Sequence, residues 1–371
     1  MTAVDEVRRI EADAAPTRFA RGWHCLGLAR DFRDDHPHAV HAFGQKLVVW
    51  ASDEGLHVLD AYCRHMGGDL TLGTVKDDTL ACPFHDWRWG GDGRCKAVPY
   101  ARRVPPRART AAWPTAEQDG LLFVWNDPEG NAPSTDLMVP RIPGATSDEW
   151  TDWVWYTTTI DNANCREVID NVVDMAHFFY VHYSFPTYFK NIFEGQTATQ
   201  IMKGMGRQDI GRGAGSSTSV ASYHGPSFMI DELTYHTEVG DLESVLINCH
   251  YPVDANSFVL QYGLIVKRTP GLEGAAADQM AKKTAEFIKL GFEQDIEIWR
   301  SKARIDNPLL CEEDGPVYQL RRWYQQFYVD VADVQPEMVD RFEFEIDTTR
   351  PNNAWRHEVE RNLSQREGSS V

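Results

Sequence analysis

The 371-residue sequence lacks long apolar runs. Its longest, such as Leu121 to Trp125, are far shorter than the roughly 20 residues that cross a bilayer. The N-terminal residues MTAVDEVRRIEADAAP mix acids with bases and contain no apolar segment of the kind found in signal peptides. We therefore expect a cytoplasmic protein with no membrane insertion.

Basic residues are also scarce, with 37 Lys and Arg against 55 Asp and Glu, a formal net charge of −18. A field of this sign repels phosphate backbones, so we expect no nucleic-acid partner. Hydrophobic residues make up 42% of the chain and aromatic residues 11%, enough for sizeable cores. At about 150 residues per domain, the length predicts two domains.

Cysteine is sparse and odd in number, with seven residues in a long chain. Without an export signal, a disulfide framework is not expected, and functional cysteines should bind metal. Cys63 and Cys82 belong to a paired motif. The other five have no assigned role, and buried free cysteine packs mostly as a small hydrophobe: Cys25, Cys95, Cys165, Cys249 and Cys311.

Short strand-like runs punctuated by Gly, Asp and Asn fill the first third of the chain and predict an all-β domain over residues 20–130. After a proline-bearing segment, mixed helices and strands predict a larger α+β domain of helix-grip type over residues 131–371, with residues 1–19 packing on it. Residues 276–303 have the periodicity of one long helix. The polar residues 356–371 are expected to fray.

Two Cys and two His occur in paired short spacings: Cys63-x-His65, sixteen residues, then Cys82-x-x-His85. A zinc site is the alternative, but zinc fingers put both Cys first and both His last, whereas each pair here carries one of each. Mixed pairs suit a two-iron cluster in which one iron takes both thiolates and the other both imidazoles. This is the ligand set of a Rieske [2Fe–2S] centre.

The string C-x-H-x-G…C-P-x-H-x-W resembles Rieske proteins, with informative departures. Rieske proteins of the respiratory bc complex tie their two cluster loops with a further cysteine pair, and the matching positions here are Gly68 and Phe84. Those proteins also aim hydroxyl groups at the cluster, where this chain has Trp87 and Trp89. Fewer hydrogen bonds to sulfur predict a low reduction potential. The motif therefore resembles the oxygenase type of Rieske centre.

A second motif follows about a hundred residues later, Asp174-x-x-His177-x-x-x-x-His182. Histidines among aromatic residues are often core residues, but this spacing resembles Rieske non-haem iron oxygenases. In that family two His and a distant carboxylate hold a mononuclear Fe(II) and leave positions open for O₂. The resemblance implies that His177 and His182 ligate iron. It implies that Asp174 carries electrons between centres, bridging the Rieske histidine of a neighbouring subunit and an iron-site histidine.

Because His177 and His182 are five residues apart, we expect a π-bulge or a helix end between them. The third iron ligand is expected on the long helix, where Asp295 falls within an apolar stripe. Glu293 and Glu297 point away from that stripe, and the alternative is that Asp295 is a solvated surface acid. The neighbours Phe292 and Trp299 are candidates for a substrate pocket, although core packing explains them equally well.

The family resemblance covers residues from about 20 to 350. The strings ACPFHDWRWGGDG and MAHFFYVHYSFPTYFKNIFEG are similar to the oxygenase components of 3-ketosteroid 9α-hydroxylases, with Asp86 at a position where Gly is usual. This implies C9 hydroxylation of a steroid such as androst-4-ene-3,17-dione or its 1,4-diene in bacterial steroid degradation. It also implies one Rieske [2Fe–2S] cluster and one mononuclear Fe(II) per subunit, O₂ as co-substrate and a homotrimer.

The chain has no G-x-G-x-x-G and no ferredoxin-type cysteine run, so we expect electrons to come from a separate NADH-dependent reductase with flavin and [2Fe–2S] centres. Two alternatives remain. One is a Rieske sterol desaturase, or a hydroxylase of another bulky apolar substrate. The other is a Rieske electron-transfer protein without catalysis. The iron count separates these classes, since a carrier holds two irons per chain and an oxygenase three.

Overall fold

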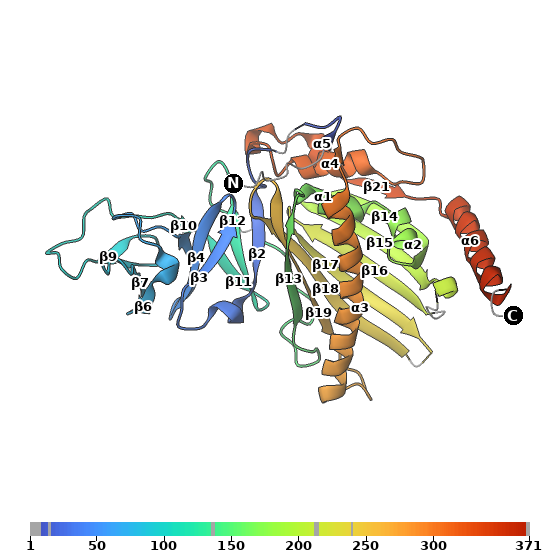
Figure 1. Cartoon of the computed structure of the whole chain (residues 1–371), viewed down its shortest axis with the longest axis horizontal. Coiled ribbons are helices and arrows are strands. Elements are labelled where there is room, and N and C mark those ends of the chain that lie inside the picture. The colour runs from blue at the N-terminus through green and yellow to red at the C-terminus, as the bar shows by residue number, and fades with distance from the viewer. Residues whose placement is uncertain (1–8, 14–15, 135–137, 211–214, 239, 369–371) are drawn as a thin grey trace.

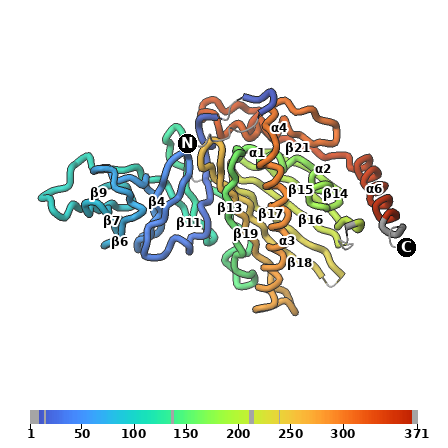
Figure 2. The backbone as a smooth tube through the Cα atoms, viewed as in Figure 1, coloured from blue at the N-terminus to red at the C-terminus, as the bar shows by residue number. Residues whose placement is uncertain are grey.

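The computed structural model describes residues 9–13, 16–134, 138–210, 215–238 and 240–368. Small antiparallel sheets from the first third of the chain lie at one end, and a large sheet with its helices lies at the other (Figure 1). Figure 2 follows the backbone from one part to the other. The predicted class is confirmed: an all-β N-terminal part precedes a larger α+β part.

Three sheets build the N-terminal part, with strand orders β10-β5-β4-β3, β11-β12-β2 and β6-β7-β8-β9. The central strand β4 is buried on both faces, so alternate side chains enter different cores. Leu47 and Val49 face β2 and β12, whereas Val48 and Trp50 pack under the loops that carry Cys63. The elements are β2 (Gly22–Leu28), η1 (Ala29–Phe32), β3 (His38–Ala42), β4 (Gln45–Ser52), β5 (Gly55–Asp60), η2 (Leu70–Leu72), β6 (Thr74–Lys76), β7 (Thr79–Ala81), β8 (Arg88–Trp89), β9 (Cys95–Ala97), β10 (Ala112–Trp113), β11 (Thr115–Gln118) and β12 (Leu121–Asn126).

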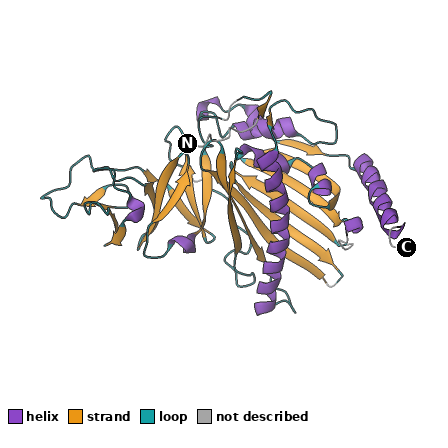
Figure 3. Ribbon diagram, in the orientation of Figure 1, coloured by secondary structure: helices purple, strands orange, loops and turns teal. Residues whose placement is uncertain are grey.

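An eight-stranded antiparallel sheet, in the order β13-β19-β18-β17-β16-β15-β14-β21, forms the larger part. Helices α3 and α2 lie over the same face of this sheet, and α4, α5 and α6 lie at its margins (Figure 3). The elements are β13 (Val154–Asp161), α1 (Arg166–Ile169), η4 (Asp170–Val172), α2 (Ala176–Tyr180), β14 (Ser184–Glu194), β15 (Thr197–Gly206), η5 (Gln208–Ile210), β16 (Ser216–His224), β17 (Phe228–Thr237), β18 (Gly240–Pro252), β19 (Ser257–Val266), α3 (Gly274–Ser301), α4 (Val317–Gln325), η6 (Val331–Asp333), α5 (Pro336–Val339), β21 (Phe342–Glu345) and α6 (Thr349–Gly368).

The two faces of the large sheet have different neighbours, as β17 shows. Phe228 and Ile230 enter a core shared with β2 and β12, which joins the sheet to the N-terminal part. Met229 and Asp231 point to the opposite face and line a cavity beneath α3. Because side chains alternate along a strand, β17 contributes one set to the interface between the two parts and the other set to the cavity.

Helix α3 spans Gly274–Ser301, close to the predicted 276–303. Asp295 and Trp299 are buried, whereas Glu293 and Glu297 are exposed, as the predicted stripe requires. No helix among the described ranges is long and apolar enough to span a membrane.

The chain ends differ from expectation in one respect. Residues 356–368, expected to fray, continue α6, and only 369–371 lie outside the described residues. The helix is held by Trp355, whose ring stacks on Phe179 at a centroid distance of 4.8 Å, and by Asn362, whose side-chain amide donates to Asp209 Oδ2 at 2.9 Å. At the N-terminus, the short strand β1 (Arg9–Ile10) pairs in parallel with β20 (Arg304–Ile305) of the larger part.

Candidate active site

The segment that carries the two candidate iron-ligating histidines is not a single helix. It consists of three short helices in succession, α1, η4 and α2. Asp174 precedes α2, and its Oδ1 accepts the backbone N–H of His177 at 3.1 Å as a cap. The helix ends at Tyr180, and the N–H groups of Val181 and His182 both donate to the carbonyl of His177, at 2.7 and 3.3 Å. The second bond spans five residues. The predicted helix end between the histidines is therefore observed.

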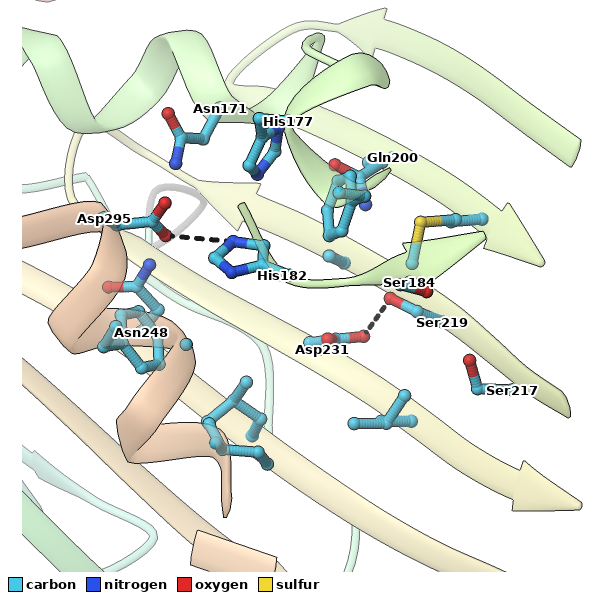
Figure 4. A pocket seen from close by; sticks show the side chains of 18 of the residues that line it. Asn171, His177, His182, Ser184, Gln200, Ser217, Ser219, Asp231, Asn248 and Asp295 are labelled. Carbon is cyan, nitrogen blue, oxygen red and sulfur yellow. Dashed lines mark hydrogen bonds and ion pairs between the residues drawn. The ribbon is translucent and has the colours of Figure 1, made fainter. Parts of the chain in front are cut away.

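Three side chains from distant parts of the chain converge beneath α3. The ligating atoms of His177, His182 and Asp295 all lie within 4.8 Å of one another. His182 Nε2 is 3.3 Å from Asp295 Oδ2, and the imidazole of His177 lies beside them (Figure 4). Asp295 is 7% exposed, so the alternative of a solvated surface acid is wrong.

Hydrogen bonds orient the two imidazoles. His177 Nδ1 donates to the backbone oxygen of Asp174 at 2.6 Å, and His182 Nδ1 lies 3.4 Å from Gln294 Oε1. Each Nε2 is left to accept or to bind a cation. Burial disfavours the charged form of His177, but the hydrogen bond to Asp174 and the charges of Asp174 and Asp295 outweigh it and raise its pKa. Such a cation-attracting group of two imidazoles and one carboxylate fits a mononuclear iron.

Asp174 lies between this group and the protein surface. Its Oδ1 is 3.8 Å from His177 Nδ1, and 48% of its side chain is exposed. The carboxylate can therefore contact His177 on one side and a docking protein on the other. Its role in electron transfer stays a prediction.

A buried arginine supports α2 and was missed by sequence reasoning. The Arg207 guanidinium lies 4.0 Å from the ring centroid of Phe179 and donates to the Phe179 carbonyl at 3.0 Å. Asp209 pairs with it at 2.7 Å. The contacts join α2 to the end of β15, and no local sequence signal marks them.

The candidate cluster ligands lie on two loops with one backbone pattern. In the first, Cys63 N–H donates to Gly68 O at 2.8 Å; in the second, Cys82 N–H donates to Trp87 O at 2.9 Å. Both cysteines are buried. Burial raises the pKa of the Cys63 thiol, and the neighbouring Cys82 raises it further.

The two candidate cluster histidines lie together beside the thiols. The rings of His65 and His85 have centroids 4.8 Å apart, and His65 stacks on Trp87 at 4.5 Å. His65 Nδ1 is buried without a hydrogen-bond partner, as expected of a nitrogen that binds a metal. All seven cysteines, each within the described ranges, are free thiols. These groups fit a [2Fe–2S] cluster held by two thiolates and two imidazoles.

Asp86, which stands where Gly is usual in related sequences, has an unusual backbone conformation. Its φ of 54° lies in the left-handed region, which explains why Gly suits this position. Aspartate tolerates this conformation better than most residues. Lys76 and Arg88 contact the Asp86 carboxylate at 2.9 and 3.5 Å and hold it there.

Gly68 is the tightest point of the cluster loops. A Cβ at this position would lie 2.7 Å from Cys82 Sγ and 3.1 Å from Phe84 Cβ. We therefore expect Gly68→Ala to displace a ligand sulfur and to lower cluster content, measured by visible absorption and by iron and sulfide analysis. Gly67→Ala is the control, because nothing lies within 4 Å of its Cβ. Alanine at its φ of 74° costs roughly 1–2 kcal/mol, without a steric clash. Full cluster content in Gly68→Ala would contradict the assignment of Cys82.

A cavity of about 490 Å³ lies between the large sheet, α2 and α3, and His177, His182 and Asp295 form part of its wall. Its volume falls in the range of small-molecule sites. Phe292 and Trp299 line it and also belong to the core that packs α3 on β19. The two alternatives for these side chains, pocket lining and core packing, are therefore both correct.

Two family models match the sequence. The Rieske [2Fe-2S] domain matches residues 22–110, and the 3-ketosteroid 9alpha-hydroxylase C-terminal domain matches residues 124–328, more than half the chain.

Relatives that match over most of their length point to the same family. A 3-ketosteroid-9-alpha-monooxygenase oxygenase component from Rhodococcus rhodochrous is 68% identical, over 97% of this chain and 93% of its own length. A protein of the same name from Mycobacterium tuberculosis is 60% identical, over 98% and 96%. The cholesterol 7-desaturase nvd 1 of Ciona intestinalis is 28% identical, over 87% and 72%.

Solved structures share the fold at low identity. NdmA of Pseudomonas putida CBB5 with caffeine superposes with a TM-score of 0.69 at 18% identity, covering 89% of this chain and 97% of that one. Dicamba monooxygenase bound to 3,6-dichlorosalicylic acid gives a TM-score of 0.68 at 16% identity, over 85% and 98%. At this identity the likeness concerns the fold.

Proposed function

The chain belongs to the family of 3-ketosteroid 9α-monooxygenase oxygenase components, and from this premise we propose that it hydroxylates a 3-ketosteroid at C9. Androst-4-ene-3,17-dione or its 1,4-diene is the expected substrate. One atom of O₂ enters the C9–H bond and the other leaves as water, with two electrons and two protons consumed. The observation that carries the proposal is a largely apolar cavity with two imidazoles and a carboxylate converging on its wall.

In this proposal each subunit holds one mononuclear iron and one cluster. The iron ligands are His177, His182 and Asp295, supported by their convergence. When bound, the iron supplies activation of O₂ and the Rieske cluster supplies electrons. The cluster ligands are Cys63, His65, Cys82 and His85.

The cavity walls bind and orient the steroid. Phe178, Met202 and Phe292 bury apolar rings, at about 25 cal/mol per Å² removed from water. Trp299 closes the wall one helical turn beyond Asp295. Excluding water from this space protects the reaction from side products.

Electrons must reach the iron site from another subunit in this proposal. The cluster loops and α2 lie in opposite parts of one chain (Figure 1). Large apolar side chains are exposed near the cluster, among them Met66, Leu72 and Phe84, and Tyr180 is exposed on α2. Such surfaces are typical of interaction sites. They support a head-to-tail homotrimer in which the cluster of one subunit docks near Asp174 of the next.

A separate NADH-dependent reductase with flavin and [2Fe–2S] centres would feed the cluster, consistent with the name "oxygenase component" of the relatives. The electron-carrier alternative gives no role to the converging His177, His182 and Asp295. The cytoplasmic location stays a prediction.

The test is a single turnover with iron-replete protein, reductase, NADH, isotopic O₂ and androst-4-ene-3,17-dione. Mass spectrometry and NMR should find one labelled oxygen at C9. An iron analysis of the same protein should give three irons per chain, whereas two would indicate a carrier. Absence of product, from protein whose cluster is intact and reduces normally, would reject the 3-ketosteroid assignment.

A further inference from the structure

A carboxyl group lies in the cavity wall apart from the candidate iron ligands. Asp231 on β17 is 7% exposed and lines the cavity. Ser219 Oγ on the adjacent strand β16 donates to its Oδ1 at 2.7 Å (Figure 4). Among the hydrogen bonds of the described residues, Oδ2 has no partner. Burying an acid in a largely apolar cavity is costly, so this group calls for an explanation.

The surroundings of Asp231 favour its neutral form. Burial raises its pKa to about 6, the hydrogen bond from Ser219 opposes this in part, and the charge of Glu232 adds to it. Among the described residues, no Lys or Arg side chain lines the cavity to stabilise a carboxylate. A carboxyl group in this position therefore keeps its proton to a higher pH than an ordinary aspartic acid, and in that form it donates a hydrogen bond.

No titratable residue stands opposite Asp231 on the two adjacent strands. Its cross-strand partners are Ala221 on β16 and Leu246 on β18, both uncharged. Glu232 points to the opposite face of the sheet and is exposed. The titratable groups that share the cavity are Tyr223 on β16, Tyr235 and His236 on β17, His177 on α2, His182 after it, and Asp295 on α3.

Two further polar atoms of the same cavity wall are unsatisfied. Asn248 Oδ1 on β18 and the Tyr223 hydroxyl on β16 are buried, have no hydrogen-bond partner and belong to residues that line the cavity. Buried polar groups without partners are rare and call for water or a ligand. Asp231 stands on the strand between them. The three adjacent strands β16, β17 and β18 thus place unsatisfied polar atoms on a largely apolar wall, an arrangement suited to an oxygen substituent of a flat apolar ligand.

We propose that Asp231 is a specificity-determining residue that binds a ketone oxygen of the steroid as a neutral carboxylic acid. Ser219 holds Oδ1 as an acceptor and leaves Oδ2 to carry the donated proton. A ketone oxygen only accepts hydrogen bonds, so a carboxylate facing it would repel it. The inference rests on the proposed function, because it takes the substrate to be a ketosteroid.

Proton linkage distinguishes this role from packing. In slightly alkaline buffer the free carboxyl is mostly ionised, so binding the ketone should take up as much as one proton. Affinity should fall by up to about tenfold for each pH unit above the pKa of the free carboxyl. Isothermal titration calorimetry of the holoprotein with androst-4-ene-3,17-dione, in buffers of different ionisation enthalpy, measures both quantities.

Three variants complete the test. Asp231→Asn supplies a permanent N–H donor, so below the pKa of the free carboxyl its affinity should stay within about threefold of wild type. Above that pKa it should bind more tightly than wild type, with no proton uptake and no fall of affinity with pH. Below the pKa of the free carboxyl, Asp231→Leu should bind about tenfold more weakly than wild type, the value of one buried hydrogen bond. Glu232→Gln, on the opposite face, is the matched control. It removes only the smallest of the three influences on the pKa of Asp231, so proton uptake should remain and affinity should stay within about threefold of wild type.

Two steroids identify the ketone. Androst-4-en-3-one lacks the C17 oxygen and 5α-androstan-17-one lacks the C3 oxygen. The Asp231→Leu loss should persist for the steroid that keeps the recognised ketone and disappear for the other. An equal loss for both steroids and the dione, or tight binding of the dione by wild type without proton uptake, would overturn the inference.

Formation of the C9 product in the same preparation tests the proposed function. With product present these outcomes overturn only the role of Asp231, whereas absence of product overturns both.

Discussion

Replacing Asp295 with alanine is expected to lower steroid hydroxylation by about 1,000-fold, more than the 10- to 100-fold that loss of a metal ligand's outer partner costs. The carboxylate is buried and lies 3.3 Å from His182 Nε2. It is the only negative charge among the three proposed iron ligands. Without it two neutral imidazoles remain, which bind ferrous iron weakly, and iron content should fall from three to two per chain.

The cluster provides the internal standard for this experiment. Visible absorption of the Rieske centre should be unchanged in Asp295→Ala, since Cys63 and Cys82 belong to the core of the N-terminal part, with Trp50 of β4. Glu293→Ala is the matched control: it removes an exposed carboxylate two residues earlier on α3 and should retain three irons and full turnover. Wild-type iron content and turnover in Asp295→Ala would show that another group completes the site.

Local patterns predicted the features that depend on nearby residues. The position of Asp295 follows from the 3.6-residue period of α3, which is set within the helix itself. The helix end between His177 and His182 follows from a spacing of five, which no regular α-helix brings onto one face. The fold class followed from runs and spacings of the same local kind.

Features set by distant contacts could not be predicted. In β17, Asp231 and Glu232 are adjacent acids, and only the packing of the sheet decides which one faces the cavity. The tail looked too polar to be ordered, but Trp355 stacks on Phe179 and Asn362 donates to Asp209, and these contacts across the fold hold α6. Arg207 likewise gains its role from pairing across the fold.

Asp174→Asn is expected to lower turnover by about 100-fold or more while both metal centres stay occupied, the effect expected for a residue that acts on a metal site through its ligand. The amide oxygen can still accept the His177 N–H, so the cap of α2 is kept. The negative charge is lost, and with it the proposed bridge between His177 and the Rieske histidine of a neighbouring subunit. Stopped-flow oxidation of the prereduced cluster by O₂ and substrate measures the transfer directly.

Hydrogen peroxide separates electron delivery from damage to the iron site. Peroxide carries oxygen that is already reduced, so it needs no electrons from the cluster. Product formed with peroxide should therefore be equal in Asp174→Asn and wild type. Asp174→Ala is the structural comparison, since it also removes the cap and should destabilise α2 by about 1 kcal/mol. If Asp174→Asn oxidises its cluster at the wild-type rate, or loses peroxide-driven product as well, then Asp174 is not the bridge, and its half-exposed carboxylate serves only to cap the helix that carries His177.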